Sequence, residues 1–257
     1  MGAEMHRQII GVQVRPYSRI ADIYDRLTGI TDFQRTRRTF ESLVRHYGIV
    51  FRSAVDVGCG TGLFACYLSE VWRIPVFAVD RSSEMLAAAK RNCRSARICF
   101  LKQDFRRLCL PFPVELATAN TYTLNHLLND RALVQALRRI HRNLKPSAHL
   151  LFDIITDSQA PPIHGGLQQR TLLPKAEVVQ QVHWHPARKL LSIVVIQRRA
   201  GSSLASAESY VGRGYSLLEV GRCLRHAGFM IRGIHDADTL QPATKFSSKA
   251  FIVAVRK

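Results

Sequence analysis

One stretch decides the fold of this chain: Val55-Asp56-Val57-Gly58-Cys59-Gly60-Thr61-Gly62-Leu63-Phe64. It opens with β-branched apolar residues, continues through glycines at every second position and resumes as an apolar helical pattern. This order predicts a strand, a tight turn and the start of a helix. Glycines let the main chain approach a ligand and adopt dihedral angles that a Cβ forbids. The free N–H groups at the helix start would point at the same turn.

Two nucleotide-binding motifs come close to this stretch without matching it. The dinucleotide fingerprint G-x-G-x-x-G has its third glycine one position later, and the P-loop needs a lysine that this stretch lacks. The spacing of Asp56, Gly58, Gly60 and Gly62 resembles instead the first motif of class I S-adenosylmethionine-dependent methyltransferases, an acidic residue followed by G-x-G-x-G. A glycine-rich turn that binds no ligand is the alternative.

Two more acidic strand ends follow in the order that this family shows. An apolar run ends at Asp80, about 20 residues past the loop, where an acid suits the hydroxyls of a ribose. The next run ends at Asp104 and Phe105. In the family such an acid binds the adenine amino group, and the neighbouring apolar side chain covers the ring. The resemblance therefore implies S-adenosyl-L-methionine as cofactor and S-adenosyl-L-homocysteine as product.

The resemblance also implies a fold class. We predict an α/β protein with a seven-stranded, doubly wound, Rossmann-like core over residues 51–257. Helical spacing at 16–27 and 33–47 predicts an N-terminal helical cap over residues 1–50.

An inserted antiparallel lid is predicted over residues 156–212. Alternating apolar and polar residues at 177–184, 190–197 and 205–211 predict its strands. A plain surface sheet is the alternative, and these strands could also join two copies of the chain as a homodimer. If the segment is a lid, His183, Trp184 or His185 could contact the acceptor.

The cofactor contacts implied by the resemblance come from the glycine loop, the acidic strand ends and their neighbours. The candidates are Asp56, Gly58, Cys59, Gly60, Gly62, Asp80, Arg81, Met85, Asp104, Phe105, Asn120 and Tyr24.

The segment after the predicted fourth strand indicates the kind of acceptor. Asn120-Thr121-Tyr122 lacks the two prolines found here in adenine- and glutamine-directed methyltransferases. The run Leu124–Leu127 resembles instead the small-molecule N- and O-methyltransferases of bacterial secondary metabolism. This resemblance implies catalytic roles for His126, Asn125 and Tyr17, and the pKa of histidine suits proton uptake near neutrality. A helix-capping histidine and a core tyrosine are the alternatives.

The charge of the chain is strongly basic. It has 37 Lys and Arg against 19 Asp and Glu, a net charge of +18 and a pI near 10.4. Such a balance favours polyanionic partners. The basic residues are nevertheless spread over predicted helices and strand ends, without the aromatic residues of an RNA-binding module. A solvated basic surface is therefore favoured over a nucleic-acid groove, and the alternative stays open.

The cysteine spacing and the length of the apolar runs indicate the cellular location of the protein. The six cysteines show neither C-x-x-C pairs nor zinc-finger spacing, so we expect reduced, structural cysteines and no metal site. The apolar runs are too short to span a membrane, and residues 1–7 carry no signal-peptide apolar region. We expect a cytoplasmic protein without a membrane partner.

These observations together predict an enzyme. It would move a methyl group from S-adenosylmethionine to a nitrogen or oxygen atom of a small molecule, by direct displacement and without metal. Two alternatives stay open: an RNA, DNA or protein methyltransferase, favoured only by the charge, and a non-catalytic cofactor-binding relative.

Overall fold

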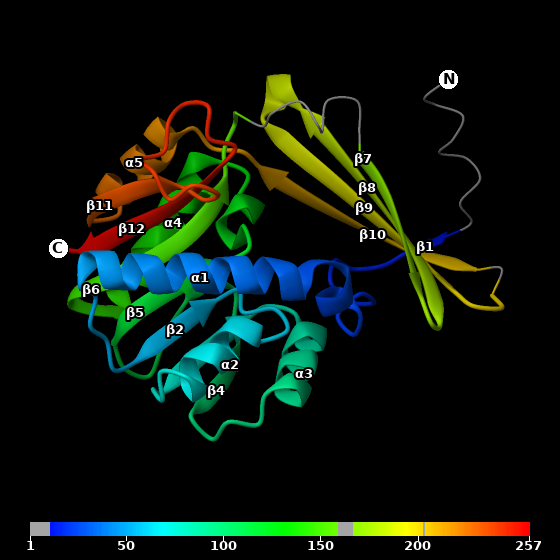
Figure 1. Cartoon of the computed structure of the whole chain (residues 1–257), viewed down its shortest axis with the longest axis horizontal. Coiled ribbons are helices and arrows are strands. Elements are labelled where there is room, and N and C mark those ends of the chain that lie inside the picture. The colour runs from blue at the N-terminus through cyan, green and yellow to red at the C-terminus, as the bar shows by residue number, and fades with distance from the viewer. Residues whose placement is uncertain (1–10, 159–166, 203) are drawn as a thin grey trace.

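Two β-sheets organise the chain in the computed structural model, which describes residues 11–158, 167–202 and 204–257 (Figure 1). The larger sheet has seven strands in the order β11-β12-β6-β5-β2-β3-β4. Only β12 runs antiparallel to its neighbours. The strands are β2 (Ala54–Val57), β3 (Val76–Asp80), β4 (Ile98–Lys102), β5 (Val114–Ala119), β6 (Leu144–Ile155), β11 (Phe229–Asp236) and β12 (Lys249–Arg256). The predicted seven-stranded α/β fold is confirmed.

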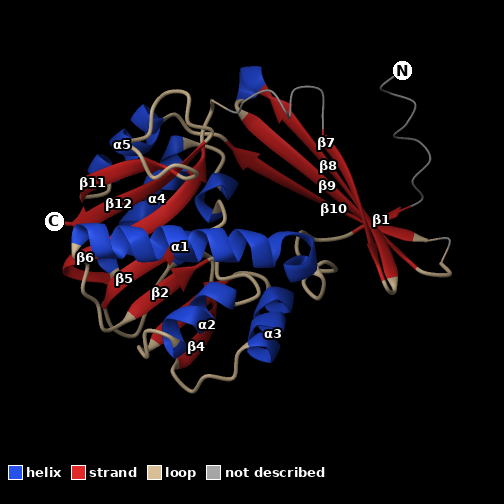
Figure 2. Cartoon of the chain, viewed as in Figure 1, coloured by secondary structure: helices blue, strands red, loops and turns tan. Residues whose placement is uncertain are grey.

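Helices cover both faces of this sheet, as Figure 2 shows. The α-helices are α1 (Ile30–Tyr47), α2 (Leu63–Glu70), α3 (Ser83–Asn92), α4 (Asp130–Arg142) and α5 (Leu217–His226). Short 3₁₀ turns, η2 (Phe105–Arg107) and η3 (Thr123–His126), follow β4 and β5. Because side chains of a strand alternate between the two faces, neighbouring residues of one strand enter different cores.

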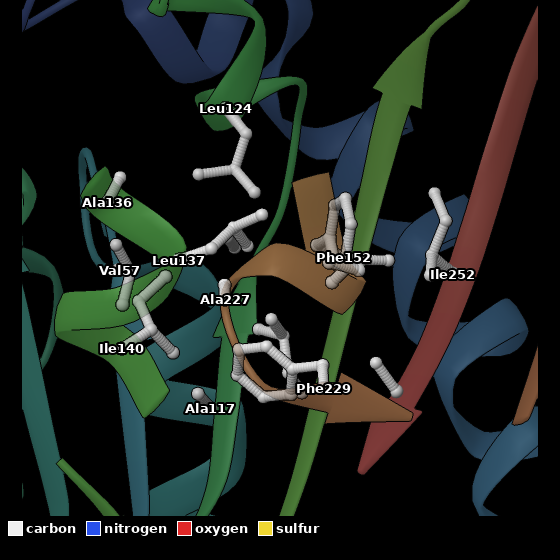
Figure 3. Packing of buried hydrophobic residues seen from close by; sticks show 14 of the residues in the cluster. Val57, Ala117, Leu124, Ala136, Leu137, Ile140, Phe152, Ala227, Phe229 and Ile252 are labelled. Carbon is white, nitrogen blue, oxygen red and sulfur yellow. The ribbon is translucent and has the colours of Figure 1, made fainter. Parts of the chain in front are cut away.

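The core beneath α4 and α5 is dry and closely packed. Figure 3 shows Leu137 and Ile140 of α4 lying against the sheet beside Phe152 and Phe229. These four side chains are at most 1% exposed. The opposite core packs α1 and α2 around Phe40, which is fully buried. In the described part of the chain, no helix combines the length and apolar character needed to cross a membrane.

The second sheet projects away from this core (Figure 1). Its order is β1-β10-β9-β8-β7. The strands are β1 (Gly11–Gln13), β7 (Leu167–Leu173), β8 (Ala176–His185), β9 (Leu190–Arg199) and β10 (Ala205–Arg213), with a 3₁₀ turn, η5 (Pro186–Arg188), between β8 and β9. The three predicted antiparallel strands are confirmed as β8, β9 and β10. The sequence analysis missed β7 and β1, and β1 pairs in parallel with β10.

The predicted helix over 16–27 is wrong. Residues 16–23 form turns, and a π-helical segment, η1 (Asp25–Gly29), leads directly into α1. Tyr17 has φ +64°, which no α-helix allows. Glu208 of β10 accepts hydrogen bonds from backbone N–H groups of this segment, so a tertiary contact replaces the helical bonds.

The expectation that all six cysteines are reduced is also wrong. Cys66 of α2 and Cys93, which follows α3, form a disulfide with Cα atoms 5.7 Å apart. They lie 27 residues apart in sequence, so no local sequence motif predicts this disulfide. The other cysteines, Cys59, Cys99, Cys109 and Cys223, are free.

We predict that the purified, unfolded chain shows four reactive thiols without reductant and six after reduction. Cys66→Ser should lower the free energy of unfolding by about 3 kcal/mol, because the crosslink restricts the unfolded chain. Thiol titration in denaturant and chemical denaturation measure the two quantities. Cys99→Ser, an exposed free cysteine, is the matched control and should leave stability unchanged. Six thiols without reductant would contradict the pairing.

Candidate functional site

A cavity of about 170 Å³ opens where the parallel strands β2, β3 and β5 end. Ligands of open α/β sheets bind beyond the carboxyl ends of the strands. The η1 segment, α1, η2 and η3 supply the remaining walls. The lining residues are Tyr17, Tyr24, Asp25, Phe33, Thr36, Asp56, Gly58, Cys59, Gly60, Thr61, Leu63, Phe64, Asp80, Arg81, Met85, Asp104, Phe105, Arg106, Asn120, Thr121, Thr123, His126 and Leu127.

The glycine loop needs its glycines for two different reasons. Gly58 (φ +68°) lies so close to Thr123 that a Cβ would stand 2.5 Å from its Cγ2 atom. Gly62 (φ +81°) meets Ala89 of α3 in the same way, at 2.8 Å. A Cβ on Gly60 (φ +53°) would meet no atom within 4 Å. Two glycines thus allow close packing behind the loop, and the third leaves its cavity side open.

Asp80 closes the loop from the neighbouring strand. Its Oδ2 accepts the Gly60 N–H at 2.9 Å, and its Oδ1 accepts the Ser82 N–H at 2.8 Å. Burial raises the pKa of this carboxyl. The acid at the end of β3 therefore lines the cavity and also holds the backbone of the glycine loop.

Asp56, the acid of the first motif, lies deeper than the other site residues. It is 2% exposed and accepts a hydrogen bond from Thr118 Oγ1 at 2.7 Å. Burial raises its pKa to about 7. The hydrogen bonds from Thr118 and from the Ala65 backbone lower the pKa and offset part of this rise. By bonding Ala65, the carboxylate fixes the first turn of α2 below the loop.

Asp104 and Phe105 both reach the cavity wall, as predicted. The Asp104 carboxylate is also paired with Arg106, whose Nε lies 3.0 Å from both carboxylate oxygens. This hydrogen bonding lowers the pKa of Asp104. Arg106 itself lines the cavity, and the sequence analysis did not identify it.

Asn120 presents an unsatisfied amide to the cavity. The residue is 7% exposed, and neither its Nδ2 nor its Oδ1 has a hydrogen-bond partner within the described chain. Buried amides without partners are costly, so a ligand that bonds Asn120 would remove this cost. The next two residues, Thr121 (φ +54°) and Tyr122 (φ +60°), are held in the left-handed region by Asp153, which accepts both N–H groups at 3.1 and 2.8 Å.

Tyr17 and His126 meet at the other end of the cavity. The Tyr17 hydroxyl lies 2.9 Å from His126 Nε2. His126 also makes a hydrogen bond with the backbone of Val211 in β10, which leaves Nε2 to accept from the tyrosine. Burial, and then the Arg81 charge, lower the pKa of His126. Burial raises the pKa of Tyr17, so the pair consists of neutral imidazole and phenol at neutral pH.

Glu208 holds Tyr17 in this place. Its side chain is on β10, is 1% exposed and accepts the backbone N–H groups of Tyr17 (2.7 Å), Arg19 (2.5 Å) and Ile20 (3.2 Å). The Tyr210 hydroxyl donates to the same carboxylate. The Tyr210 ring packs on the Tyr17 ring, with 4.5 Å between their centroids. One buried carboxylate thus joins the projecting sheet to the segment that carries Tyr17.

Two predicted site residues lie outside the lining. Gly62 packs on α3 behind the loop. Asn125 uses both N–H groups on the Ile155 and Arg213 carbonyls, and its Oδ1 accepts the Ile155 N–H. Its amide thus joins η3 to β6 and β10. Of the aromatic residues considered for the lid, Trp184 is 4% exposed and packs near Gly214; His183 and His185 are exposed on β8.

The structure also adds residues that the sequence analysis did not single out. Asp25 accepts a hydrogen bond from Thr61 Oγ1 at 2.5 Å and one from Asn92 at 3.0 Å. Asp25 therefore links the N-terminal segment to both the glycine loop and α3. Asp25 follows Tyr24 directly, so the Tyr-Asp pair in the sequence could have indicated Asp25 as a site residue. Phe33 and Thr36 of α1 gave no such signal.

Comparison with known proteins finds similarity to methyltransferases. A family model for methyltransferase domains matches residues 54–147. The protein YqeM of Bacillus subtilis (strain 168) is 28% identical over 140 residues, 54% of this chain and 55% of YqeM, so the chain spans about half the length of that relative. The cypemycin N-terminal methyltransferase of a Streptomyces species is 25% identical over 210 residues, 80% of this chain and 84% of the relative.

Residues 54–147 of this chain thus match a methyltransferase domain. The fold of the chain is similar to that of the sugar N-methyltransferase KedS8 from Streptoalloteichus sp ATCC 53650, with a TM-score of 0.75, 20% identity and 92% coverage of both chains. The site fits S-adenosylmethionine. Gly60 leaves its cavity side open, Asn120 offers an unsatisfied amide and the Asp80 carboxylate faces a cavity at the strand ends.

Gly58→Ala should weaken the binding of S-adenosylmethionine and its product. The new Cβ would lie at a positive φ and 2.5 Å from Thr123, so the loop must move. Calorimetric titration with S-adenosylhomocysteine should show a dissociation constant raised at least about tenfold, a loss of about 1.4 kcal/mol. Gly48→Ala is the matched control, because Gly48 has φ +60° but open space around it after α1. Equal affinities of Gly58→Ala and the wild type would contradict the close-packed loop.

Glu208→Gln should destabilise the chain by about 2 kcal/mol, because an amide donor would face N–H groups inside a buried site. Denaturant unfolding measures this loss. Glu177→Gln on β8 is the matched control, since Glu177 pairs with Arg170 at the surface of the same sheet. Equal stabilities of the two variants would show that the Glu208 bonds do not hold the segment.

Proposed function

We propose that this methyltransferase transfers the methyl group to a nitrogen or oxygen atom of a small molecule. The observation that carries this proposal is the Tyr17–His126 pair, a neutral base and a hydroxyl 2.9 Å apart inside the cavity. Tyr24 packs edge-on against Tyr17 at 6.2 Å and Phe33 lines the same cavity, so aromatic side chains restrict the space for an acceptor. A small acceptor fits this space better than a folded macromolecule does.

S-adenosylmethionine, when bound, supplies an electrophilic methyl group on a positively charged sulfur. The glycine loop, Asp80 and Asn120 would hold it by backbone approach, carboxylate and amide. The buried cavity would exclude water and align the acceptor with the methyl carbon, and alignment can supply several kcal/mol of the barrier.

Tyr17 and His126 would take up the proton that the acceptor loses. Tyr17 passes its hydroxyl proton to His126 Nε2 and receives the proton of the acceptor. Burial lowers the pKa of His126, so its Nε2 is unprotonated and able to accept a proton at neutral pH.

The relatives favour nitrogen as the methylated atom. The cypemycin enzyme is named for an N-terminal amine, and KedS8 for the nitrogen of a sugar. We also infer that residues 1–50 act as a cap and residues 156–212 as a lid on the core of residues 51–257, and that the enzyme acts in the cytoplasm. A homodimer through the inserted strands is a further prediction, supported by the exposed Leu167 and Leu172 on the edge strand β7.

The test is transfer of a labelled methyl group from S-adenosylmethionine to a panel of amino sugars and short peptides with free N-termini. The same assay with total RNA and with unfolded protein tests macromolecular acceptors. Label in an amine of the panel supports the proposal. Label in RNA or protein alone would overturn it, and cofactor binding without transfer to any acceptor would favour the non-catalytic relative.

His126→Ala should lower kcat on an accepted amine by about 10²-fold or more, since a positioned base contributes that much. In the wild type, kcat should fall with decreasing pH through a pKa below 6.5, because only the neutral imidazole accepts a proton and burial lowers its pKa. The variant should lose this acidic limb. His46→Ala, an exposed histidine of α1 outside the cavity lining, is the control and should retain both. An unchanged pH profile in His126→Ala would remove His126 from the mechanism.

A further inference from the structure

The groove between α4 and α5 is a strongly cationic hollow. It encloses about 750 Å³ on the face of the sheet opposite α1. We call it the arginine groove. It is lined by Asp130, Arg131, Val134, Gln135, Arg138, Arg139, Arg142, Arg222, Cys223 and His226.

The charge of the arginine groove is not balanced within the protein. Among the described residues, no carboxylate lies within ion-pair distance of Arg131, Arg138, Arg139 or Arg142. The one acid of the groove, Asp130, is already paired with Arg213 at 2.7 Å and lies 3.8 Å from Arg222.

Several arginines of α1 and α3, in contrast, lie in ion pairs. Arg37 of α1 pairs with Glu41, and Arg91 of α3 pairs with Asp22. Like charges gathered in one hollow repel one another and do not stabilise the fold. The cluster is therefore better explained by an anion that it receives than by the packing of α4 on α5.

The cations form a row along α4. Arg131, Arg138 and Arg142 are spaced by seven and four residues, which places them on one side of a helix. Their Cα atoms span about 16 Å at 1.5 Å per residue. Arg138 also donates Nε and Nη2 to the His226 carbonyl at 3.3 Å, so it bridges the row to α5. A row of this length suits an extended anion with repeated charges.

The lining indicates which polyanion fits. Val134 and Cys223 are its only apolar residues, whereas protein partners need an apolar interface core. Interfaces with nucleic acids are more polar and much more positive. Arginine binds phosphate through two parallel hydrogen bonds. No aromatic residue lines the arginine groove on which a base could stack.

We propose that the arginine groove binds the phosphate backbone of a nucleic acid, without sequence preference. The nucleic acid would lie beside the cavity and not in it. Gln135 of the groove donates to the Arg106 carbonyl at 3.5 Å, and Arg106 lines the cavity, so the two sites adjoin through this contact. The proposal does not depend on the identity of the methyl acceptor.

The test is fluorescence anisotropy of a fluorescein-labelled 20-nucleotide oligothymidylate, titrated with the full chain between 50 and 200 mM salt. The variant Arg138→Ala/Arg142→Ala should bind about tenfold more weakly at low salt. Its plot of log K against log salt should be shallower by about 1.4, since each lost contact to a single strand removes about 0.7. The control Arg94→Ala/Arg97→Ala removes the same charge from exposed, unpaired arginines after α3 and should match the wild type.

Three outcomes would overturn the proposal. Equal weakening of both variants would assign the binding to diffuse surface charge. Absence of binding by the wild type at 50 mM salt would show that the groove holds no nucleic acid. Stronger competition by polyglutamate than by unlabelled oligothymidylate at equal charge would assign the groove to an acidic protein. Thermal unfolding of each variant confirms that it is folded.

Discussion

The parallel pairing of β2 with β3 and β5 is the constraint on which the methyl-transfer site depends. It brings three chain segments, each separated by a helix, to one edge of the sheet. The glycine loop, Asp80 and Asn120 therefore face one cavity although they span more than 60 residues of sequence. Close contacts behind the loop then exclude any residue larger than glycine at two of its positions. Thr123 and Ala89 stand where side chains on Gly58 and Gly62 would be.

The second half of the site depends on a single carboxylate. Glu208 accepts three backbone N–H groups of the N-terminal segment, which otherwise would have to form helical bonds or meet water. The hydrogen bonds to Glu208 replace local helical bonds with contacts between residues that lie 188 to 191 positions apart in the sequence. The result is that Tyr17 reaches His126 from a turn. The N-terminal segment and the projecting sheet thus together place Tyr17 beside His126.

The arginines of the chain include some that lie in surface ion pairs and some that lie in the arginine groove without a carboxylate partner. Three arginines of α1 and α3 take part in ordinary surface ion pairs, which contribute little to stability. Arg131, Arg138, Arg139 and Arg142 of the arginine groove have no ion-pair partner among the described residues and share one hollow. The cavity at the strand ends, lined by aromatic and neutral groups beside Tyr17 and His126, is thus distinct from this charged surface.

The sequence by itself determined the seven-stranded core and most of the cofactor wall. Glycine spacing, acids at strand ends and helical periodicity are local signals, and they placed Asp80, Phe105 and Asn120 correctly at the cavity. Tyr17 and His126 became candidates through the resemblance to small-molecule methyltransferases, and the structure brings them together. Only the tertiary structure decided the turn over residues 16–23, the Cys66–Cys93 crosslink, the structural use of the Asn125 amide and the clustering of arginines between α4 and α5. Each of these depends on partners distant in the sequence, and local propensity carries no information about such partners.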